Sequence, residues 1–367
     1  MAAGRRNNAA DPPRRPRTTV TGTAIVRLRA GRGARVPQFA SIWVATALLF
    51  AISPLLATGS DSSSALLSML PFASILAIAA IGQTLVIQQR GLDLSVAGMI
   101  TLTTIIVTNV PNGDGAKLPE AIGLVVVACA CSGLVSGIAI TRFGITPLVA
   151  TLGTGALLQG AILQITSGTA NISTPSSLDT FALDKTLGIP NTALIAVAVL
   201  VIVSAVIRST VLGRRFVAVG ASPPAARAAA IRVRTYELGT YIAAALAYGG
   251  AGILVAGYLR TPGIASGDDY LLPTIAAVVL GGTSLAGGMG SVIATAGGAL
   301  FLTQLEQVVL GMGAPNSVQL VIQGAIIALG MGLRTAPWGR LRPLLRGARG
   351  PAAPTAVFPD VGERAEP

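Results

Sequence analysis

The sequence predicts an all-α integral membrane protein of about ten transmembrane helices, some of them interrupted or re-entrant. Two features of its composition carry this prediction: hydrophobic residues make up 52% of the 367 residues, and charged residues only 11%. A soluble domain carries about 25% charged residues, and one water-soluble globule cannot hide this much apolar surface. The composition therefore excludes an ordinary soluble enzyme.

Ten apolar runs, near the length of about 20 residues that a bilayer requires, lie between two polar tails. Residues 1–36 carry nine arginines and several prolines, which predicts a basic, disordered cytoplasmic tail. Residues 37–333 form the predicted transmembrane domain, and residues 334–367 form a second basic, Pro-rich cytoplasmic tail. The predicted spans are Phe39–Thr58, Leu66–Ile87, Leu94–Val110, Ala121–Ile140, Ile145–Thr166, Ala193–Leu212, Tyr236–Gly257, Tyr270–Ala286, Gly290–Gly311 and Val318–Leu333.

The distribution of charge predicts the orientation of these spans. Ten spans place both ends on one side, and with both tails inside, 23 Lys and Arg residues fall on inner segments. Only three, Lys117, Lys185 and Arg260, fall on outer segments. Because inner loops are rich in Lys and Arg, we expect both termini in the cytoplasm. The same loops account for the net charge of +12, so this charge does not indicate a nucleic-acid partner.

Three absences from the sequence exclude most enzyme classes. The chain has no His, which removes His-based zinc and haem sites and Ser-His pairs. Its two cysteines, Cys129 and Cys131, predict neither a disulfide framework nor a metal site. It also lacks a G-x-x-x-x-G-K-[ST] phosphate loop. We therefore expect no catalytic residue, metal or cofactor on this chain, and any ATP hydrolysis must take place on another chain.

Two predicted spans depart from a continuous helix. The third begins directly after Gly91-Leu92-Asp93, and the eighth contains Pro273 and runs into the glycine-rich segment 281–288. Non-helical backbone at membrane depth is tolerated only beside protein or a water-filled cavity, and paired interrupted spans mark the substrate path of transporters. The alternative is that the glycines allow close helix packing, as Gly133 and Gly137 indicate for the fourth span.

Two carboxylates lie at or within predicted spans. Asp93 lies at the mouth of the third span, next to Arg90, and Glu306 lies well inside the ninth. Such groups usually face a cavity or a partner, but Asp93 also fits the N-cap of the third helix, because Asp favours helix starts. Glu306 either lines an aqueous path or pairs with a polar neighbour such as Gln304. Two carboxylates without His or Lys partners disfavour a proton-coupled carrier.

Two loops carry more information than the others. The outer segment Gly168–Thr192 is rich in Ser, Thr, Asn and Gly, and it either receives a soluble partner or only connects two spans. The inner segment Gly213–Thr235 contains two prolines followed by an Ala-rich stretch, which predicts a short helix over Pro223–Ile231. Small side chains there suit a closely packed protein partner, with Ala226 as the sensitive position, whereas the arginines suit an anchor on lipid head groups.

Four segments of the chain form recognisable motifs. The longest covers Ile275–Val292 and reads IAAVVLGGTSLAGGMGSV. The other three are Gly91–Val96 (GLDLSV), Pro147–Thr154 (PLVATLGT) and the inner loop Gly220–Ile231. These motifs resemble those of the membrane permeases of bacterial ribose-type ABC sugar importers, and the first is the most specific. Together the matches extend from about Leu66 to Leu333 and leave the tails uncovered.

Several positions depart from the pattern of that family. These departures leave the family assignment intact and leave the solute open. Arg90, Ala97 and Ala230 stand where the family commonly has Gly, Ser222 replaces Asn, Leu271 replaces Glu, and Glu306-Gln307 replaces an Asn-Gly pair.

The resemblance implies a fold like that of type II ABC importers, and a bacterial inner-membrane location. It implies that two permeases, copies or paralogues, form the pathway in membrane lipid, that an ABC ATPase holding ATP and Mg sits on the cytoplasmic loops, and that an extracytoplasmic solute-binding protein delivers the solute. The ATPase-coupling loop would comprise Gly220, Pro223, Ala225, Ala226, Arg227 and Ile231. The translocation path would include Asp93, Ser95, Thr151, Gly153, Thr154, Gly281, Gly282, Thr283 and Ser284.

Three alternative functions stay open from the sequence. A secondary carrier or channel would act without an ATPase. An ABC permease could also serve a solute other than a sugar, such as a branched-chain amino acid or a nucleoside. A non-transport membrane protein is the third, although the absence of His and of any acid–base pair argues against an intramembrane enzyme.

Overall fold

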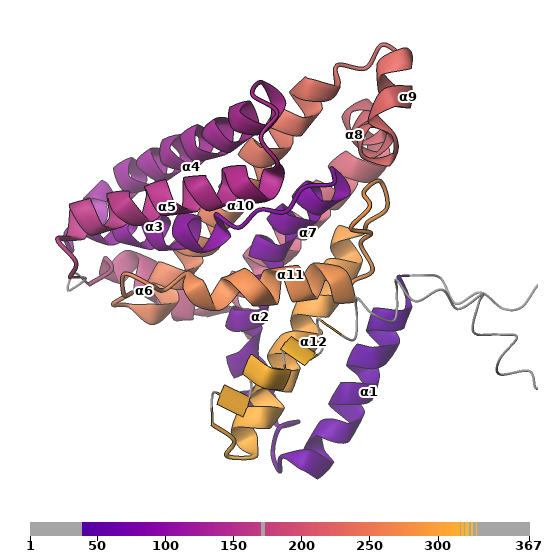
Figure 1. Ribbon diagram of the computed structural model, residues 1–367. Helices are drawn as coiled ribbons and strands as arrows, with labels where there is room; N and C mark the ends of the chain where they lie inside the picture. The colour runs from indigo at the N-terminus through magenta and orange to yellow at the C-terminus, as the bar shows by residue number, and fades with distance from the viewer. Residues whose placement is uncertain are drawn as a thin grey trace, which may run out of the picture. The chain divides into compact units, whose positions relative to one another are not determined.

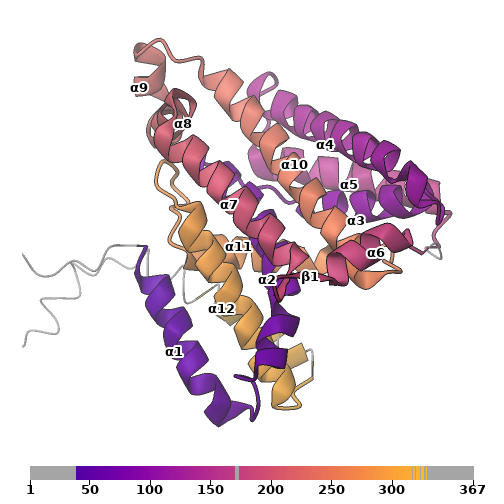
Figure 2. The same ribbon diagram turned by 180° about the vertical axis from the view of Figure 1, so that it is seen from behind.

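The computed structural model describes residues 39–169, 173–315, 317–318, 320–322, 324–325 and 328. Both predicted tails, and most of the tenth predicted span, lie outside the described residues. The described part is almost entirely helical (Figures 1 and 2). Its α-helices are α1 Ser41–Leu56, α2 Ser63–Gln88, α3 Val96–Asn109, α4 Leu118–Thr141, α5 Pro147–Thr166, α6 Ser176–Leu183, α7 Asn191–Ser209, α8 Val211–Ala221, α9 Pro223–Ala228, α10 Val233–Leu259, α11 Leu271–Leu280 and α12 Val292–Gly311.

The remaining elements are short. Two 3-10 turns, η1 Gly115–Lys117 and η2 Asp268–Tyr270, precede α4 and α11. Two-residue strands, β1 Lys185–Thr186 and β2 Ile189–Pro190, pair antiparallel, with Lys185 opposite Pro190. The outer segment that we expected to be a loop is therefore built from α6 and this hairpin.

Six helical segments in the described residues are long and apolar enough to cross a membrane: α2, η1 with α4, α5, α7, α10 and α12. The apolar helices α1 and α3 have only 16 and 14 residues. The predicted eighth span is not a span of its own, because α11 has ten residues and ends at Gly281. Ten residues of helix rise about 15 Å, which is half of a hydrocarbon core of about 30 Å. The expected interruption is confirmed, whereas ten full-length spans are not found among the described residues.

Helix α2 holds the two main apolar clusters together. One cluster joins α2 to α3, α4 and α10, and it includes Tyr248, whose hydroxyl donates to Gln83 Oε1 at 2.9 Å. The other joins α2 to α11 and α12 through small side chains such as Ala80, Ala277 and Ala299. Because α2 belongs to both clusters, any displacement of its end acts on both sides of the bundle.

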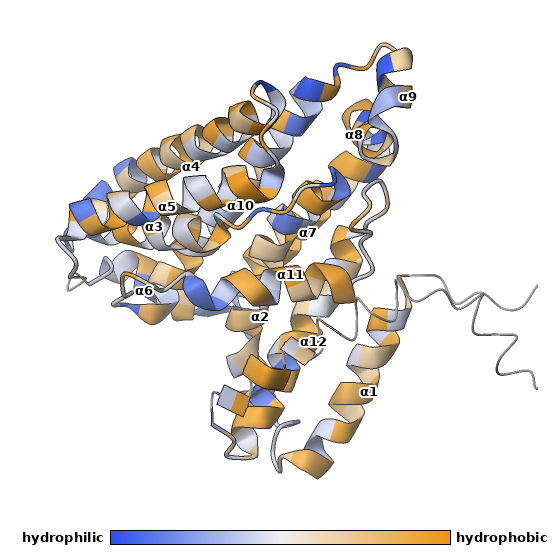
Figure 3. Cartoon of the chain, viewed as in Figure 1, coloured by the Kyte–Doolittle hydropathy of each residue, from blue (hydrophilic) through white to orange (hydrophobic). Residues whose placement is uncertain are grey.

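The outward faces of α4, α5 and α7 are apolar and exposed in the isolated chain, and Figure 3 shows the apolar colouring along α4 and α5. In the most apolar stretch of each helix, only 33% of the residues are buried in η1 with α4, 28% in α5 and 22% in α7. Large exposed apolar faces mark contact with lipid or with another membrane protein. Examples are Val126 and Val127 of α4, Leu152 and Leu157 of α5, and Val201 and Ile202 of α7.

Glycines allow α4 and α10 to approach closely. A Cβ added at Gly133 would lie 2.6 Å from the carbonyl oxygen of Tyr241 and 2.7 Å from the Cα of Ile242, and one at Gly137 would lie 3.2 Å from the Cα of Leu238. These neighbours are mostly backbone atoms, which cannot rotate away. The GxxxG pair is therefore a packing device.

We predict that Gly133→Ala lowers the thermal stability of the purified protein, because α10 must move to admit the methyl group. The cost is about 1–3 kcal/mol, as for overpacking in a core. Gly123→Ala is the matched control on the same helix, since a Cβ there meets nothing within 4 Å. It should leave the unfolding temperature unchanged or raise it. Equal stability of the two variants would contradict this account of the α4–α10 contact.

Candidate functional site

The inner segment that we expected to couple to a partner consists of two short helices at one end of the bundle (Figures 1 and 2). Helix α8 ends where Ser222 turns extended, with φ −155° and ψ 94°. The Ser222 hydroxyl accepts a hydrogen bond from the Ala225 N–H at 3.4 Å and so caps α9, which begins with Pro223. The predicted helix over Pro223–Ile231 is present but ends earlier, at Ala228.

The side chain of Ala226 points into this chain. It is 3% exposed and packs with Val219 of α8 and Val233 of α10. We expected Ala226 to face a partner, and that expectation is wrong. Which side of a helix as short as α9 is buried depends on the elements it packs against, and the sequence alone does not reveal them. The exposed residues on and directly after α9 are Pro224, Ala225, Arg227, Ala228 and Ala229.

Helix α9 ends in a Schellman motif that contains no glycine. The Ala230 N–H donates to the Arg227 carbonyl and the Ile231 N–H donates to the Ala226 carbonyl, both at 3.0 Å. Ala230 has φ +58°, a left-handed conformation that glycine adopts without cost. This strain is the physical cost of having Ala here in place of Gly.

A junction at the end of α2 holds the coupling segment. Helix α2 also ends in a Schellman motif, with Arg90 at φ +66°. The Arg90 side chain donates from Nε to the Gly220 carbonyl at 2.9 Å and from Nη2 to the Ala221 carbonyl. Gln89 Nε2 adds a bond of 2.7 Å to the Phe216 carbonyl. The last turn of α8 is therefore tied to the end of α2, directly before α9.

The glycine-rich segment after α11 closes the junction from the third side. The Gly288 N–H donates to the Gln88 carbonyl at 2.9 Å. Gly288 has φ +76°, and a Cβ there would lie 2.6 Å from the Cα of Ala221. A side chain at Gly220 would collide with the Gln88 carbonyl, and one at Gly287 with the Arg90 side chain. Three segments distant in sequence thus meet with almost no space between them.

The loop between α2 and α3 is pinned by buried polar groups. Asp93 is 2% exposed, and its Oδ1 accepts from the Ser95 N–H at 2.9 Å and from the Ser95 hydroxyl at 2.6 Å. Ser95 itself occupies the N-cap position, so Asp93 supports the helix start from two residues away and is not the N-cap. Thr151 of α5 accepts from the Leu94 N–H at 3.1 Å.

The remaining predicted path residues divide between two places. On α5, Thr154 shares a hydrogen bond of 2.8 Å with Ser136 of α4, while Gly153 lies on an open face. The other group, Gly281 to Ser284, lies in the turn that follows α11. There a Cβ at Gly281 would lie 2.6 Å from the Thr295 nitrogen, so this glycine serves close packing with α12. The structure brings Asp93, Ser95 and Thr151 together, and it places the 281–284 group on a separate loop.

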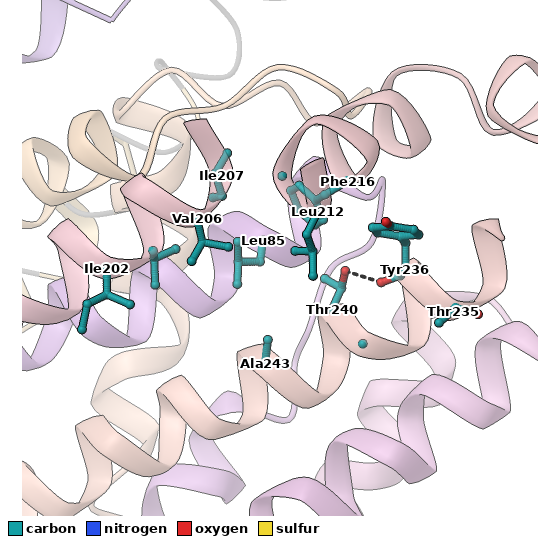
Figure 4. Close-up of a pocket in the computed structure, with 13 residues that line it drawn as sticks. Leu85, Ile202, Val206, Ile207, Leu212, Phe216, Thr235, Tyr236, Thr240 and Ala243 are labelled. Atoms are coloured by element: carbon teal, nitrogen blue, oxygen red, sulfur yellow. Dashed lines mark hydrogen bonds between the residues drawn. The ribbon is translucent and has the colours of Figure 1, made fainter. Parts of the chain in front are cut away.

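An apolar cavity of about 470 Å³ lies between α2, α7, α8 and α10 (Figure 4). Its polar lining side chains include Thr240, whose hydroxyl is already donated to the Tyr236 carbonyl at 2.7 Å. Such a wall offers few bonds to a hydroxylated solute. Sequence reasoning missed this cavity, because its lining is drawn from four helices: Leu85, Ile202, Val203, Val206, Ile207, Leu212, Gly213, Phe216, Thr235, Tyr236, Gly239, Thr240 and Ala243.

The outer segment, described from residue 173 onward, packs against the helical bundle. Helix α6 packs on α10, where a Cβ at Gly257 would lie 2.8 Å from that of Ala182. Burial raises the pKa of the Asp179 carboxyl, and the nearby Arg260 guanidinium opposes that rise. The β1–β2 hairpin projects Leu187, which is 97% exposed.

Comparison with known proteins gives the family. The family described as branched-chain amino acid transport system / permease component matches residues 65–331. This chain belongs to that family of ABC importer permeases. It is 31% identical over 290 residues to the ribose import permease protein RbsC of Escherichia coli K12, covering 78% of this chain and 90% of that protein.

Two further relatives agree. RbsC of Bacillus subtilis 168 is 32% identical over 267 residues, which is 72% of this chain and 82% of that protein. The autoinducer 2 import system permease protein LsrD of E. coli K12 is 33% identical over 257 residues, which is 68% of this chain and 77% of that protein. No solved structure matched significantly. As an ABC importer permease, the chain is a multi-pass membrane protein and a transport subunit, not an enzyme, and its family implies an ATPase and a solute-binding protein as partners.

We predict opposite effects for two glycine substitutions in this permease. Ala230→Gly removes only the left-handed strain and should raise stability by about 1 kcal/mol. Arg90→Gly removes the same kind of strain but also two charge-assisted bonds to α8, each worth about 1.5–3 kcal/mol when buried and less here because the site is partly exposed. Thermal unfolding of both variants in detergent tests this. An Arg90→Gly protein as stable as Ala230→Gly would show that the Arg90 bonds do not hold the junction.

Proposed function

We propose that this permease forms the translocation path for a monosaccharide or a similar neutral, hydroxylated solute. The observation that carries the proposal is the identity to two ribose import permeases across nine-tenths and four-fifths of their lengths. The chemistry of the chain agrees, because its membrane-depth polar groups are mainly hydroxyls, such as those of Ser95, Thr151 and Thr154. Hydroxyls that already bond to neighbours bind a solute weakly, which suits passage without trapping.

We further propose that the end carrying α8 and α9 lies in the cytoplasm, together with both termini, in a bacterial inner membrane. Five exposed arginines support this orientation, since inner loops are rich in Lys and Arg. The junction supports it as well, because the end of α2, the α8 end and the 284–290 segment all fall on the inner side in the charge-based topology. These arginines are Arg214, Arg215, Arg227, Arg232 and Arg234.

The exposed side of α9 is the proposed contact for an ABC ATPase, which holds ATP and Mg while this chain binds no cofactor. Pressure on α9 passes to α8 through the buried contact of Ala226 with Val219. From α8 it reaches the end of α2 through the Arg90 bonds, and from there the loop that Asp93 supports. A solute-binding protein delivers the solute to the outer segment with α6 and the hairpin, and a second permease, copy or paralogue, completes the path in the lipid bilayer.

The proposed function is tested by reconstitution of the permease with its ATPase and binding protein in proteoliposomes. Uptake of labelled D-ribose that requires ATP and the binding protein supports the proposal. ATP-dependent uptake of leucine or a nucleoside in place of any sugar would overturn the solute class. Ribose uptake that needs no ATPase would favour a secondary carrier.

The proposed orientation predicts which cysteines a reagent reaches from outside. In a background with Cys129 and Cys131 replaced, we expect a membrane-impermeant maleimide to label Leu187→Cys and to spare Ala229→Cys in intact cells. Both positions are exposed, so accessibility is matched. Permeabilised cells should show labelling of both. The reverse pattern in intact cells would invert the orientation.

The burial of α9 predicts a split between two tryptophan substitutions. Ala225 is exposed, so Ala225→Trp should leave folding intact but abolish co-purification of the ATPase and solute-stimulated ATP hydrolysis, because a bulky ring separates a closely packed contact. Ala226→Trp should lower the folded yield, because overpacking between Val219 and Val233 costs about 1–3 kcal/mol. Normal ATPase binding by a well-folded Ala225→Trp protein would exclude α9 as the coupling element.

A further inference from the structure

A second, polar cavity lies far from the coupling segment. Its volume is about 370 Å³, within the range of small-molecule sites. A smaller cavity of about 220 Å³ shares Phe72, Thr303 and Glu306 with it. Helices α10 and α12 begin near the junction and reach this region with their opposite ends, so the two cavities lie in the outer half under the proposed orientation.

The loop before α11 forms one wall of this cavity and is bonded to a neighbouring helix. The Gly267 N–H donates to the hydroxyl of Thr101, a buried residue of α3, at 2.9 Å. The segment of η2 thus folds back against a membrane helix. Non-helical backbone at membrane depth persists where it is surrounded by protein or lines a water-filled cavity. Asp268 and Asp269 of η2 line the larger cavity.

Polar atoms that lack partners point to a ligand. Thr303 is 5% exposed and lines both cavities, yet its hydroxyl forms no hydrogen bond within the described residues. Gln307 lines the smaller cavity, and its buried Oε1 also lacks a partner there. Buried polar groups are normally satisfied, so the Gln307 Oε1 is in need of a partner. The Thr303 hydroxyl belongs to the wall of both cavities, where it is suited to a bond with a bound molecule.

The rest of the wall fits a sugar. Phe72 and Tyr258 form an edge-on aromatic pair with ring centroids 4.8 Å apart, and Phe72 lines both cavities while Tyr258 lines the smaller. The carboxylates of Asp268, Asp269 and Glu306 accept hydrogen bonds from hydroxyl groups and repel anions. The described part of the chain contains no cluster of three His, Cys, Asp or Glu that could hold a metal ion, which argues against a divalent-cation site.

We propose that these connected cavities bind a neutral polyhydroxylated molecule and select it against anionic sugars. The inference rests on the proposed function and deepens it, because it assigns the first binding position in the membrane to Glu306, Thr303 and the η2 carboxylates. Glu306 and the η2 carboxylates supply the charge that excludes phosphorylated or acidic sugars. Thr303 and Gln307 supply hydrogen-bonding groups for the bound molecule.

The test measures protection of a single cysteine in the full-length permease in nanodiscs. With Cys129 and Cys131 replaced, Leu272→Cys places a thiol at an exposed position of the cavity wall. Its rate of reaction with a small neutral maleimide is measured with D-ribose, D-galactose, D-ribose 5-phosphate or L-leucine. We expect at least one neutral sugar to slow the reaction, and the phosphate and leucine to leave it unchanged. Leu187→Cys, on the remote hairpin, should react at one rate throughout.

Two substitutions then assign the residues. Thr303→Val removes a hydroxyl without a partner, so it should keep thermal stability while the sugar concentration for half-protection rises about tenfold, the loss expected for one good hydrogen bond. Glu306→Gln should raise it by a similar factor and allow the sugar phosphate to protect. Glu120→Gln, an exposed glutamate on α4, is the matched control and should change neither.

The outcomes separate this inference from the proposed function. Sugar uptake by the wild-type complex without any sugar protection at position 272 would overturn the cavity alone. Equal protection by the sugar and its phosphate, or unchanged protection in both Thr303→Val and Glu306→Gln, would overturn it as well. Protection by leucine in place of sugars, with ATP-driven leucine uptake, would overturn both proposals together.

Discussion

The closeness of three backbone segments at the end of α2 is the constraint on which the rest of this permease depends. A Cβ at Gly220 of α8 would collide with the Gln88 carbonyl, one at Gly287 with the Arg90 side chain, and one at Gly288 with the backbone of Ala221. Arg90 also fixes the end of α8 by hydrogen bonds, because its guanidinium donates to the successive carbonyls of Gly220 and Ala221. A contact without slack cannot absorb a displacement, so movement of α8 must move α2 or break these bonds. Since α2 belongs to both apolar clusters, a movement of α8 that displaces the end of α2 reaches both sides of the bundle.

The long helices could be predicted from the sequence because hydropathy alone determines them. The predicted Leu66–Ile87, Ala121–Ile140 and Tyr236–Gly257 each lie inside an observed helix that is only slightly longer. The interruption after α11 was equally predictable, since glycines weaken helices wherever they cluster. The predicted eighth span, Tyr270–Ala286, is not a full-length helix, because α11 stops at Leu280 where the glycine-rich segment begins. Hydropathy reports which segments avoid water, but it does not report where the backbone leaves the helix.

The site was less predictable because its details depend on tertiary contacts. The Pro223 helix start follows from local chemistry and is found. The burial of Ala226 follows from Val219 and Val233, which the sequence does not place beside it. Asp93 was expected as the N-cap or as a path residue; Ser95 takes the N-cap position, and the Asp93 carboxylate accepts from the Ser95 N–H and hydroxyl. The place of Asp93 on the translocation path stays a prediction. The importance of Arg90 could have been noticed from the sequence, because it departs from the glycine expected from the family pattern. Its left-handed backbone conformation destabilises the fold, and its two hydrogen bonds to the end of α8 offset that strain.

The chemistry of the two ends of the described bundle differs in a way that fits directional passage. Near α8 the cavity is apolar and the surrounding surface is basic, whereas beyond the far ends of α10 and α12 the cavities carry carboxylates, amides and aromatic rings. In the proposed path, a neutral sugar gains most of its hydrogen bonds at the second place. Between them, the hydroxyls of Thr84, Thr154 and Thr295 are already paired with other hydroxyls, so they hold the helices and offer little to a solute. In this proposal, a molecule that moves from the polar cavity toward the α8 end finds fewer hydrogen-bonding groups along its way. Its return is opposed only if the helices around α2 close behind it. Closure of that kind requires work, and under the proposed function work applied to α9 would enter the membrane domain through the Arg90 junction.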